Sequence, residues 1–314
     1  MRVGLYFDSR LPVRKYGGTE RVVVWLGRGL ARLGHEPILI TPPGSRVTEI
    51  PSVGIPKDAV RRMAFEPGFR IDPYLPAGLD VLHCHSQVRG DCNVPRIITI
   101  HGNASEPDFG PEHVFVSRDH MRRMGGTHFV HNGIDPDDYV FAREKEDFLL
   151  FLGLASRSVK GVDRAQRIAR RAGARLVIAG GRRLNLTPKV KFVGLVDDRR
   201  KRELLSRARA LLNPIRWEEP FGLVVVEALA SGTPVLASRR GAMPELVTPD
   251  VGFLCDDDEA FVRALESVSA IDATACRARV EGCFTHLHMA RGYVRLYELA
   301  IAGRLDEPHA ESPL

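Results

Sequence analysis

The sequence has little cysteine, few aromatic residues and no long apolar segment. Only 5 of its 314 residues are Cys, and none has Cys-x-x-Cys spacing, so we expect free buried thiols rather than a disulfide framework. His83, His85 and Cys92 lack the spacing of a zinc site, and we predict no metal. No apolar run approaches the roughly 18 residues that a membrane span requires, and residues 1–10 lack a secretory apolar region. These absences favour a cytoplasmic protein.

Acidic side chains are scarce in one part of the chain and abundant in the next. Residues 151–216 contain 18 Lys or Arg against 4 Asp or Glu, whereas residues 218–270 are net acidic. A basic segment fits phosphate-bearing ligands, an anionic membrane surface or nucleic acid. Because the arginines are not interleaved with aromatic residues, which make up 7% of the chain, we expect no nucleic-acid binding. Phosphate-bearing ligands and peripheral contact with the anionic inner membrane face remain as alternatives.

Short apolar runs alternate with amphipathic patterns along the chain. Strands are predicted at residues 2–7, 37–41, 80–85, 96–100, 114–117, 147–153, 176–181, 190–193, 211–215, 233–237 and 252–255, and helices at 21–33, 58–65, 199–209 and 290–302. This order is typical of Rossmann-like units with parallel sheets, and the length favours two domains over one. Two such units imply a cleft between the domains as the default active site.

The segment at residues 218–245, EEPFGLVVVEALASGTPVLASRRGAMPE, carries two carboxylates around an apolar run. Pro220 suits a helix start and Gly232 suits a helix end, so we predict a loop, a short helix and a strand. A helix of eight residues rises about 12 Å, so Glu219 could bind a sugar while Glu227 binds a ribose across a diphosphate. In isolation, the same spacing is as a rule two solvated glutamates on a surface helix.

This segment resembles the Glu-x(7)-Glu signature of the family 4 retaining glycosyltransferases, which have the two-domain GT-B fold. The resemblance rests on the run E-P-F-G-L-x-x-x-E-A-L-A-S-G-T-P-V and on Gly241, Pro244 and Glu245 after it. It implies that Glu219 contacts the donor sugar and that Glu227 holds the ribose. Residues expected beside the donor at the helix start are Pro220, Phe221, Gly222 and Leu223, the last three through free backbone N–H groups.

Four shorter motifs carry the same resemblance. Gly17-Gly18 precedes a helix and resembles the family's G-G-x-E-R segment, which implies contact with the donor phosphates. His101 ends a predicted strand and resembles a family histidine that lies beside the donor sugar. Lys160-Gly161 resembles the family's K-G, whose lysine holds the diphosphate. Gly194 lies in a segment that resembles F-x-G-x-V, where backbone groups contact the base, so the choice between a UDP- and a GDP-sugar stays open.

The chain departs from the family pattern at several positions. Leu154 stands where the family usually has Arg, and Arg157 could supply that charge from the same loop. His131 replaces the usual proline of P-N-G-x-D, and residues 42–76 are short for the family, so part of the acceptor-binding apparatus is expected to differ. Candidate acceptor-binding residues are Tyr16, Thr19, Glu20, His85 and Asn103.

Together these patterns predict an α/β protein of the GT-B fold, with two Rossmann-like domains whose parallel sheets face each other across a cleft. The expected domains are 1–140 with the returning helix 288–303 for the acceptor and 141–287 for the nucleotide-sugar donor, followed by a flexible tail at 304–314. The resemblance implies a retaining, metal-independent transferase that moves a hexose from a UDP- or GDP-sugar to the hydroxyl of a glycan, lipid or small molecule. His101, Glu219 and Lys160 are the expected catalytic residues. Alternatives are another GT-B sugar-nucleotide enzyme, either an epimerase or an inverting transferase, and a non-catalytic nucleotide- or polyanion-binding protein.

Overall fold

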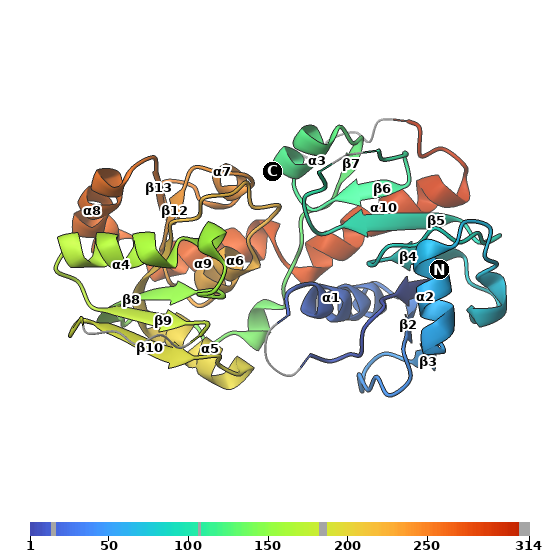
Figure 1. Cartoon of the computed structure of the whole chain (residues 1–314), viewed down its shortest axis with the longest axis horizontal. Coiled ribbons are helices and arrows are strands. Elements are labelled where there is room, and N and C mark those ends of the chain that lie inside the picture. Colours follow the sequence, from blue (N-terminus) through green and yellow to red (C-terminus); the bar gives the residue numbers. More distant parts are fainter. Residues whose placement is uncertain (14–16, 106–107, 182–186, 308–314) are drawn as a thin grey trace. The chain divides into compact units, whose positions relative to one another are not determined.

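The computed structural model describes residues 1–13, 17–105, 108–181 and 187–307. Over these residues the chain forms two compact units (Figure 1). The first unit contains Met1–Val13, Gly17–Gly133 and the segment that begins at His286, and the second unit contains Ile134–Thr285. The chain therefore leaves the first unit once and returns to it through its last helix. The end of the predicted tail, residues 308–314, lies outside the described residues.

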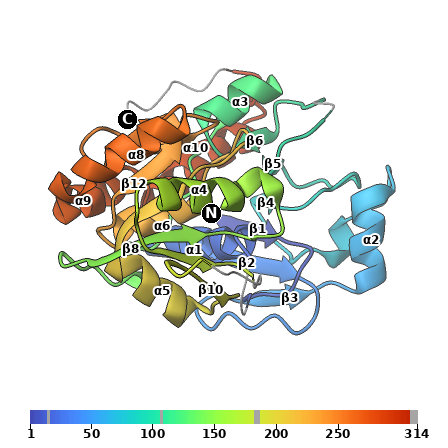
Figure 2. The same ribbon diagram turned by 60° about the vertical axis from the view of Figure 1, so that its left-hand side comes forward.

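Among the described residues, the first unit holds a seven-stranded parallel sheet in the order β3-β2-β1-β4-β5-β6-β7. Its strands are β1 (Arg2–Tyr6), β2 (Glu36–Thr41), β3 (Ser52–Gly54), β4 (Val81–Cys84), β5 (Arg96–Ile100), β6 (His113–Phe115) and β7 (His128–Phe129), and its helices are α1 (Thr19–Arg32), α2 (Lys57–Phe65), α3 (Arg118–Met124) and α10 (His286–Ile301). Neighbouring residues of a strand point to opposite faces of the sheet. Tyr6 of β1 shares an apolar cluster with Met63 of α2, whereas its neighbour Leu5 lies beside Gly27 of α1. Helices α1 and α2 therefore cover opposite faces of the sheet (Figure 2).

The second unit, over its described residues, holds a six-stranded parallel sheet in the order β10-β9-β8-β11-β12-β13. Its strands are β8 (Glu146–Leu152), β9 (Leu176–Ala179), β10 (Val190–Gly194), β11 (Ala208–Asn213), β12 (Val235–Ser238) and β13 (Gly252–Cys255), and its helices are α4 (Val162–Arg171), α5 (Asp198–Arg207), α6 (Leu223–Ala230), α7 (Met243–Leu246), α8 (Asp258–Ser267) and α9 (Ala273–Cys283). Helices α4 and α8 share one apolar cluster with β8, β9, β11 and β12. Helix α6 contacts β11, β12 and α9, which explains why it is apolar nearly all round.

These two parallel α/β sheets confirm the predicted fold class. The predicted loop, helix and strand after Glu218 are confirmed as well, because α6 begins at Leu223 and β12 follows it. Asp257 is the N-cap of α8, since its side chain accepts a hydrogen bond from the N–H of Ala260. All five Cys residues are free thiols, and Cys84, Cys255 and Cys276 are buried as predicted, whereas Cys92 and Cys283 are only partly buried. No helix in the described part of the chain combines the length and the apolar character that a membrane crossing needs.

Some predicted boundaries are wrong. The helix expected at 199–209 ends at Arg207, because Ala208 already pairs with Glu146 of β8 and begins β11. The last helix begins at His286 rather than at residue 290, and the strand expected at 114–117 ends at Phe115. Ser117 is instead the N-cap of α3, since its side chain accepts a hydrogen bond from the N–H of His120.

Helices α1 and α10 approach closely at Gly29. A Cβ atom at this position would lie 2.5 Å from the carbonyl oxygen of His286 and 2.9 Å from the Cβ of Ala290. Arg32, one turn further along α1, reaches the ring Nε2 of His286 at 2.9 Å. The absence of a side chain at Gly29 therefore lets the returning helix pack against α1.

We expect Gly29→Ala to destabilise the first unit, although alanine is the better helix former. Overpacking costs about 1–3 kcal/mol, which exceeds the roughly 1 kcal/mol that alanine gains in helix propensity. Urea denaturation should show a lower free energy of unfolding for this variant.

Gly282 on α9 provides the matched control, because it is exposed and nothing lies within 4 Å of a Cβ built there. Gly282→Ala should raise the free energy of unfolding of the second unit by about 0.5–1 kcal/mol. If Gly29→Ala and the unaltered protein have the same free energy of unfolding, α1 and α10 do not approach each other as closely as described.

Candidate functional site

Two loops at the carboxyl ends of β8 and β11 are packed together in the second unit. The N–H of Arg216 donates to the carbonyl of Val159 at 2.8 Å. Gly161, with φ of +76°, leaves no room for a side chain, because a Cβ there would lie 2.2 Å from the carbonyl oxygen of Pro214. Ligands of parallel α/β sheets bind at this edge. The close loop packing places Lys160 beside Glu219.

Lys160 and Glu219 form a largely buried ion pair. The Lys160 Nζ atom lies 2.6 Å from Glu219 Oε2, and the two side chains are 15% and 14% exposed. Trp217 supports the pair, since its ring N–H donates to the same oxygen at 2.8 Å and its ring lies 4.7 Å below the ammonium. No hydrogen bond from a described residue reaches Oε1 of Glu219, so this oxygen can accept one from a ligand.

The start of α6 follows Glu219 directly. Gly222 is its N-cap with φ of +108°, and a Cβ there would lie 2.5 Å from the Cε of Met243. No side chain of the described residues caps the helix. Gly241 lies against the backbone of Glu219 and donates its N–H to Glu218. The first N–H groups of α6 therefore point out of an uncapped, tightly packed turn, as an anion- or hydroxyl-binding site needs.

Phe221 and Pro220, which precede this turn, are buried. The ring of Phe221 is 2% exposed and packs edge-on against Phe284, so the side chain anchors the turn. Any contact of Phe221 with a ligand is left to its backbone.

Glu227, on the second turn of α6, is held by two side chains that the sequence patterns did not identify. Its Oε1 atom accepts hydrogen bonds from Tyr139 Oη and Lys201 Nζ, both at 2.7 Å. The residue is 6% exposed. Its Oε2 atom has no hydrogen bond within the described chain, so one oxygen is anchored and the other is left for a ligand.

Sequence reasoning missed Tyr139, Lys201 and Trp217 for different reasons. Lys201 belongs to the basic helix α5, where each Arg and Lys looks like a solvated charge. Tyr139 follows a short turn at Pro136–Asp138 and lies far from Glu227 in sequence. Trp217 offered a signal, because it immediately precedes Glu218 and Glu219 in a chain with only 2 Trp.

The remaining candidate residues of the second unit are Arg157 and Gly194. Arg157 is exposed and precedes the short turn Ser158–Lys160, in the same loop as Leu154. Gly194 has φ of +80°, and its carbonyl already accepts a hydrogen bond from the N–H of Gly180 at 2.8 Å. A base contact by Gly194 would therefore use its N–H or the second lone pair of its oxygen.

In the first unit, Gly17 and Gly18 lie at the start of α1, with Gly18 as N-cap. The guanidinium of Arg21 donates to the carbonyl of Gly17. The carboxylate of Glu20 lies beside Gly17, where a Cβ atom would be only 2.5 Å from it. Thr19 is the first residue of α1, and Tyr16 lies outside the described residues. A phosphate at this turn would face the charge of Glu20 as well as the helix N-terminus.

His101 follows β5 and pairs with a second histidine. Its Nε2 atom lies 3.0 Å from Nδ1 of His85, which is 4% exposed. Burial, with a smaller contribution from His120, lowers the pKa of His101 to about 3. His101 is therefore neutral at physiological pH. Because the ring of His85 is buried, any effect of His85 on a ligand passes through His101.

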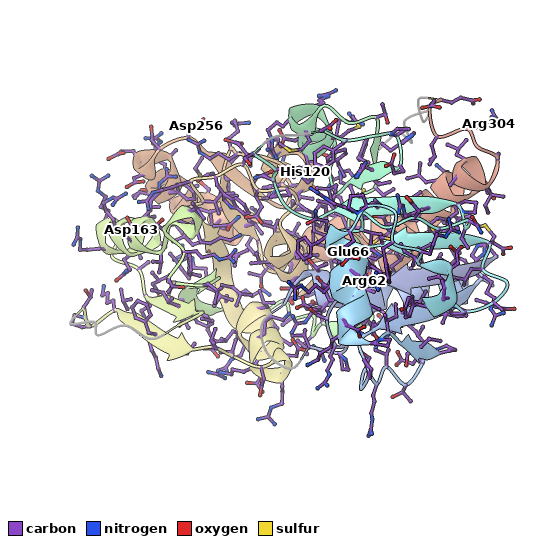
Figure 3. The ribbon with its side chains drawn as sticks, turned by 45° about the vertical axis from the view of Figure 1, so that its right-hand side comes forward. Arg62, Glu66, His120, Asp163, Asp256 and Arg304 are labelled. Carbon is purple, nitrogen blue, oxygen red and sulfur yellow. The ribbon has the colours of Figure 1, made fainter. Side chains whose placement is uncertain are left out.

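Helix α3 supports the residues after His101. The Nε2 atom of His120 (Figure 3) lies 3.1 Å from the carbonyl of Gly102, and Arg123 donates to the side-chain oxygen of Asn103 at 3.0 Å. The exposed Asn103 is thus held by α3 through its side-chain oxygen. Among the described residues, no group of three or more His, Cys, Asp or Glu is arranged to hold a metal ion.

Comparison with known proteins connects both units to sugar transfer. Residues 16–126 match the family Glycosyltransferase Family 4, and residues 146–270 match the family Glycosyl transferases group 1. A phosphatidyl-myo-inositol mannosyltransferase of Mycobacterium tuberculosis is 25% identical over 326 residues, which span 84% of this chain and 85% of that protein. A glycosyltransferase of Methanocaldococcus jannaschii is 30% identical over 152 residues, and this match spans 39% of this chain and only 38% of that protein.

Solved structures show the same fold. AviGT4, a glycosyltransferase involved in avilamycin A biosynthesis, has a TM-score of 0.75 at 28% identity, over 96% of this chain and 98% of that chain. HepE of Anabaena, solved with UDP-glucose, has a TM-score of 0.67 at 16% identity, over 95% and 99% of the two chains. Residues 16–126 and 146–270 therefore each match a glycosyltransferase family, and the chain shares the GT-B fold of the solved glycosyltransferases to which it is similar.

Proposed function

We propose that the protein transfers a hexose from a nucleotide-diphosphate sugar to an acceptor hydroxyl with retention of anomeric configuration. The observation that carries this proposal is the ion pair of Lys160 and Glu219 next to the uncapped start of α6. The pair holds a cation that can meet a diphosphate and a carboxylate that can accept hydrogen bonds from sugar hydroxyls.

Different residues are proposed to bind the diphosphate, the sugar and the ribose of the donor. Lys160 has three N–H donors and can bind a phosphate while it keeps Glu219 in place. Together with Arg157 and the helix N-termini, it would neutralise the charge that develops on the leaving diphosphate, so we propose a metal-independent transfer. Glu219, His101 and the N–H groups of Gly222 and Leu223 would fix the sugar, and Glu227 would accept hydrogen bonds from the ribose.

The proposed retention follows from front-face attack assisted by the leaving phosphate. In this scheme the acceptor hydroxyl attacks the anomeric carbon, the bond to the diphosphate oxygen breaks, and that oxygen receives the hydroxyl proton. Glu219 is not proposed as a covalent nucleophile: Lys160 and Trp217 hold its Oε2 atom, and its Oε1 atom is proposed to accept a hydrogen bond from a sugar hydroxyl. Its role is to orient the sugar.

The donor and the acceptor are proposed by class. HepE of Anabaena was solved with UDP-glucose, and a GDP-mannose-dependent mannosyltransferase of Mycobacterium tuberculosis is 38% identical over 104 residues, so UDP- and GDP-sugars are both candidates. The acceptor is a glycan, a lipid or a small molecule. A lipid acceptor would agree with peripheral contact at an anionic membrane.

Nucleotide binding is the first test of this function. We expect isothermal titration calorimetry to show binding of either UDP or GDP, and the preferred nucleotide to be released from its sugar conjugates without added metal. If none of the sugar conjugates releases its nucleotide, a non-catalytic nucleotide- or polyanion-binding protein is favoured. An inverted product, or an epimerised free sugar, would favour the other GT-B enzymes.

We expect Lys160→Met to weaken binding of the preferred nucleotide at least about tenfold, because a charge-assisted phosphate contact contributes about 1.5–3 kcal/mol. Arg157→Met removes an exposed charge of the same loop and should have a smaller effect. Equal affinities of the Lys160→Met protein and the unaltered protein would exclude Lys160 as the diphosphate ligand.

The lysine that supports Glu227 generates a further prediction. Lys201→Met should raise the nucleotide Kd several-fold, since it leaves a buried carboxylate with only Tyr139 to anchor it. Arg199→Met is the control, because it removes the same charge from the same helix at a side chain that is 89% exposed. Equal effects of the two changes would mean that Lys201 acts only through the overall charge of α5.

A further inference from the structure

His85 is a buried histidine with one engaged and one unengaged ring nitrogen. Its Nδ1 atom lies 3.0 Å from His101 Nε2, while its own Nε2 atom is buried without a hydrogen-bond partner. The ring cannot easily turn, because that of His83 lies 4.0 Å away and is itself held by Tyr297 at 2.8 Å and Thr99 at 2.7 Å. The geometry therefore fixes which nitrogen of His85 faces His101.

A neutral imidazole carries a proton on only one of its two ring nitrogens. The protonation of the nitrogen without a hydrogen-bond partner therefore determines that of the other nitrogen. A buried N–H group without an acceptor is rarer in proteins than an unused lone pair, since the lost donor is costly. His120 shows the same preference nearby: its Nε2 atom faces the carbonyl of Gly102 and must donate, while its buried Nδ1 atom has no partner. By the same rule, the unpartnered Nε2 atom of His85 is the unprotonated one.

The proton of His85 is then on Nδ1 and is donated to Nε2 of His101. Because His101 Nε2 accepts this hydrogen bond, the single proton of neutral His101 is on its Nδ1 atom. No described residue forms a hydrogen bond with that Nδ1 atom. Burial lowers the pKa of both rings, which keeps them neutral and this arrangement of protons in place.

We propose that His85 is a positioning residue that holds His101 as its Nδ1–H tautomer, so that His101 presents an N–H donor to an oxygen atom of the donor sugar. This proposal rests on the proposed function only for the identity of the ligand. With the other tautomer, His101 would present a lone pair and would need a hydroxyl proton from the sugar instead. His85 thus determines whether His101 forms its hydrogen bond with an acceptor atom or with a hydroxyl proton of the sugar.

The tautomer can be measured without any ligand. Two-bond proton–nitrogen NMR spectra of the full chain with ¹⁵N-labelled histidine rings distinguish the two neutral forms, and His101→Gln assigns the His101 signals. We expect the unaltered protein to show His101 protonated on Nδ1 and His85 protonated on Nδ1. A His101 ring protonated on Nε2 would overturn the proposal.

Variants of His85 test the control that it exerts. His85→Leu removes the donor and should let His101 populate both tautomers, whereas His85→Asn keeps a side-chain N–H donor near the place of Nδ1 and should retain the Nδ1–H form. If His101 keeps the pure Nδ1–H form in His85→Leu, His85 does not set it and the proposal fails. If His85→Leu is unfolded, the tautomer of His101 is compared between the unaltered protein and His85→Asn instead. Loss of the Nδ1–H form of His101 in the folded His85→Asn protein would contradict the proposal.

The kinetic consequence separates this proposal from the proposed function. With a donor sugar that is turned over, His85→Leu should lower kcat about tenfold or more while the Kd of the free nucleotide stays unchanged, and His85→Asn should recover most of the rate. A kcat unchanged in His85→Leu would contradict the role in sugar recognition. Absence of turnover in the unaltered protein would refute the proposed function, while the NMR result would still decide the tautomer.

Discussion

The ion pair between Lys160 and Glu219 is the constraint on which the candidate site depends. It joins the loop after β8 to the loop after β11, and these two loops can approach each other because Gly161 has no side chain at the point where it meets Pro214. A buried charge without a partner is costly, so each member of the pair compensates the charge of the other and holds it in place. The pair therefore prepares a cation and a carboxylate side by side before any ligand arrives.

Three candidate residues, Glu219, Glu227 and His101, share one arrangement of their polar atoms. Glu219 uses Oε2 for Lys160 and Trp217 and leaves Oε1, whereas Glu227 uses Oε1 for Tyr139 and Lys201 and leaves Oε2. His101 uses Nε2 for His85 and leaves Nδ1. In all three cases a supporting side chain occupies one polar atom, fixes the orientation and leaves a second atom for a ligand. Such support limits the reorganisation that binding requires.

The sequence predicted those elements that depend on residues close to one another in the chain. The run from Glu219 to Pro234 fixes a turn, a helix and a strand through neighbouring residues, and the structure has these elements in that order. The supporting residues could not be derived in this way, because Tyr139 and Lys201 meet Glu227 only through tertiary packing. The start of β11 was missed for a related reason: the alternation of Arg and Ala at residues 207–210 suits either a helix end or a strand, and only pairing with β8 decides.

We propose that the two charges of this ion pair serve different parts of the donor, Lys160 the diphosphate and Glu219 the sugar. Calorimetric titration of the Glu219→Ala protein with the preferred free nucleotide separates the two roles. We expect a Kd close to that of the unaltered protein, because Lys160 remains and is released from its partner, although turnover of the sugar nucleotide falls. A loss of nucleotide affinity as large as that of Lys160→Met would contradict it.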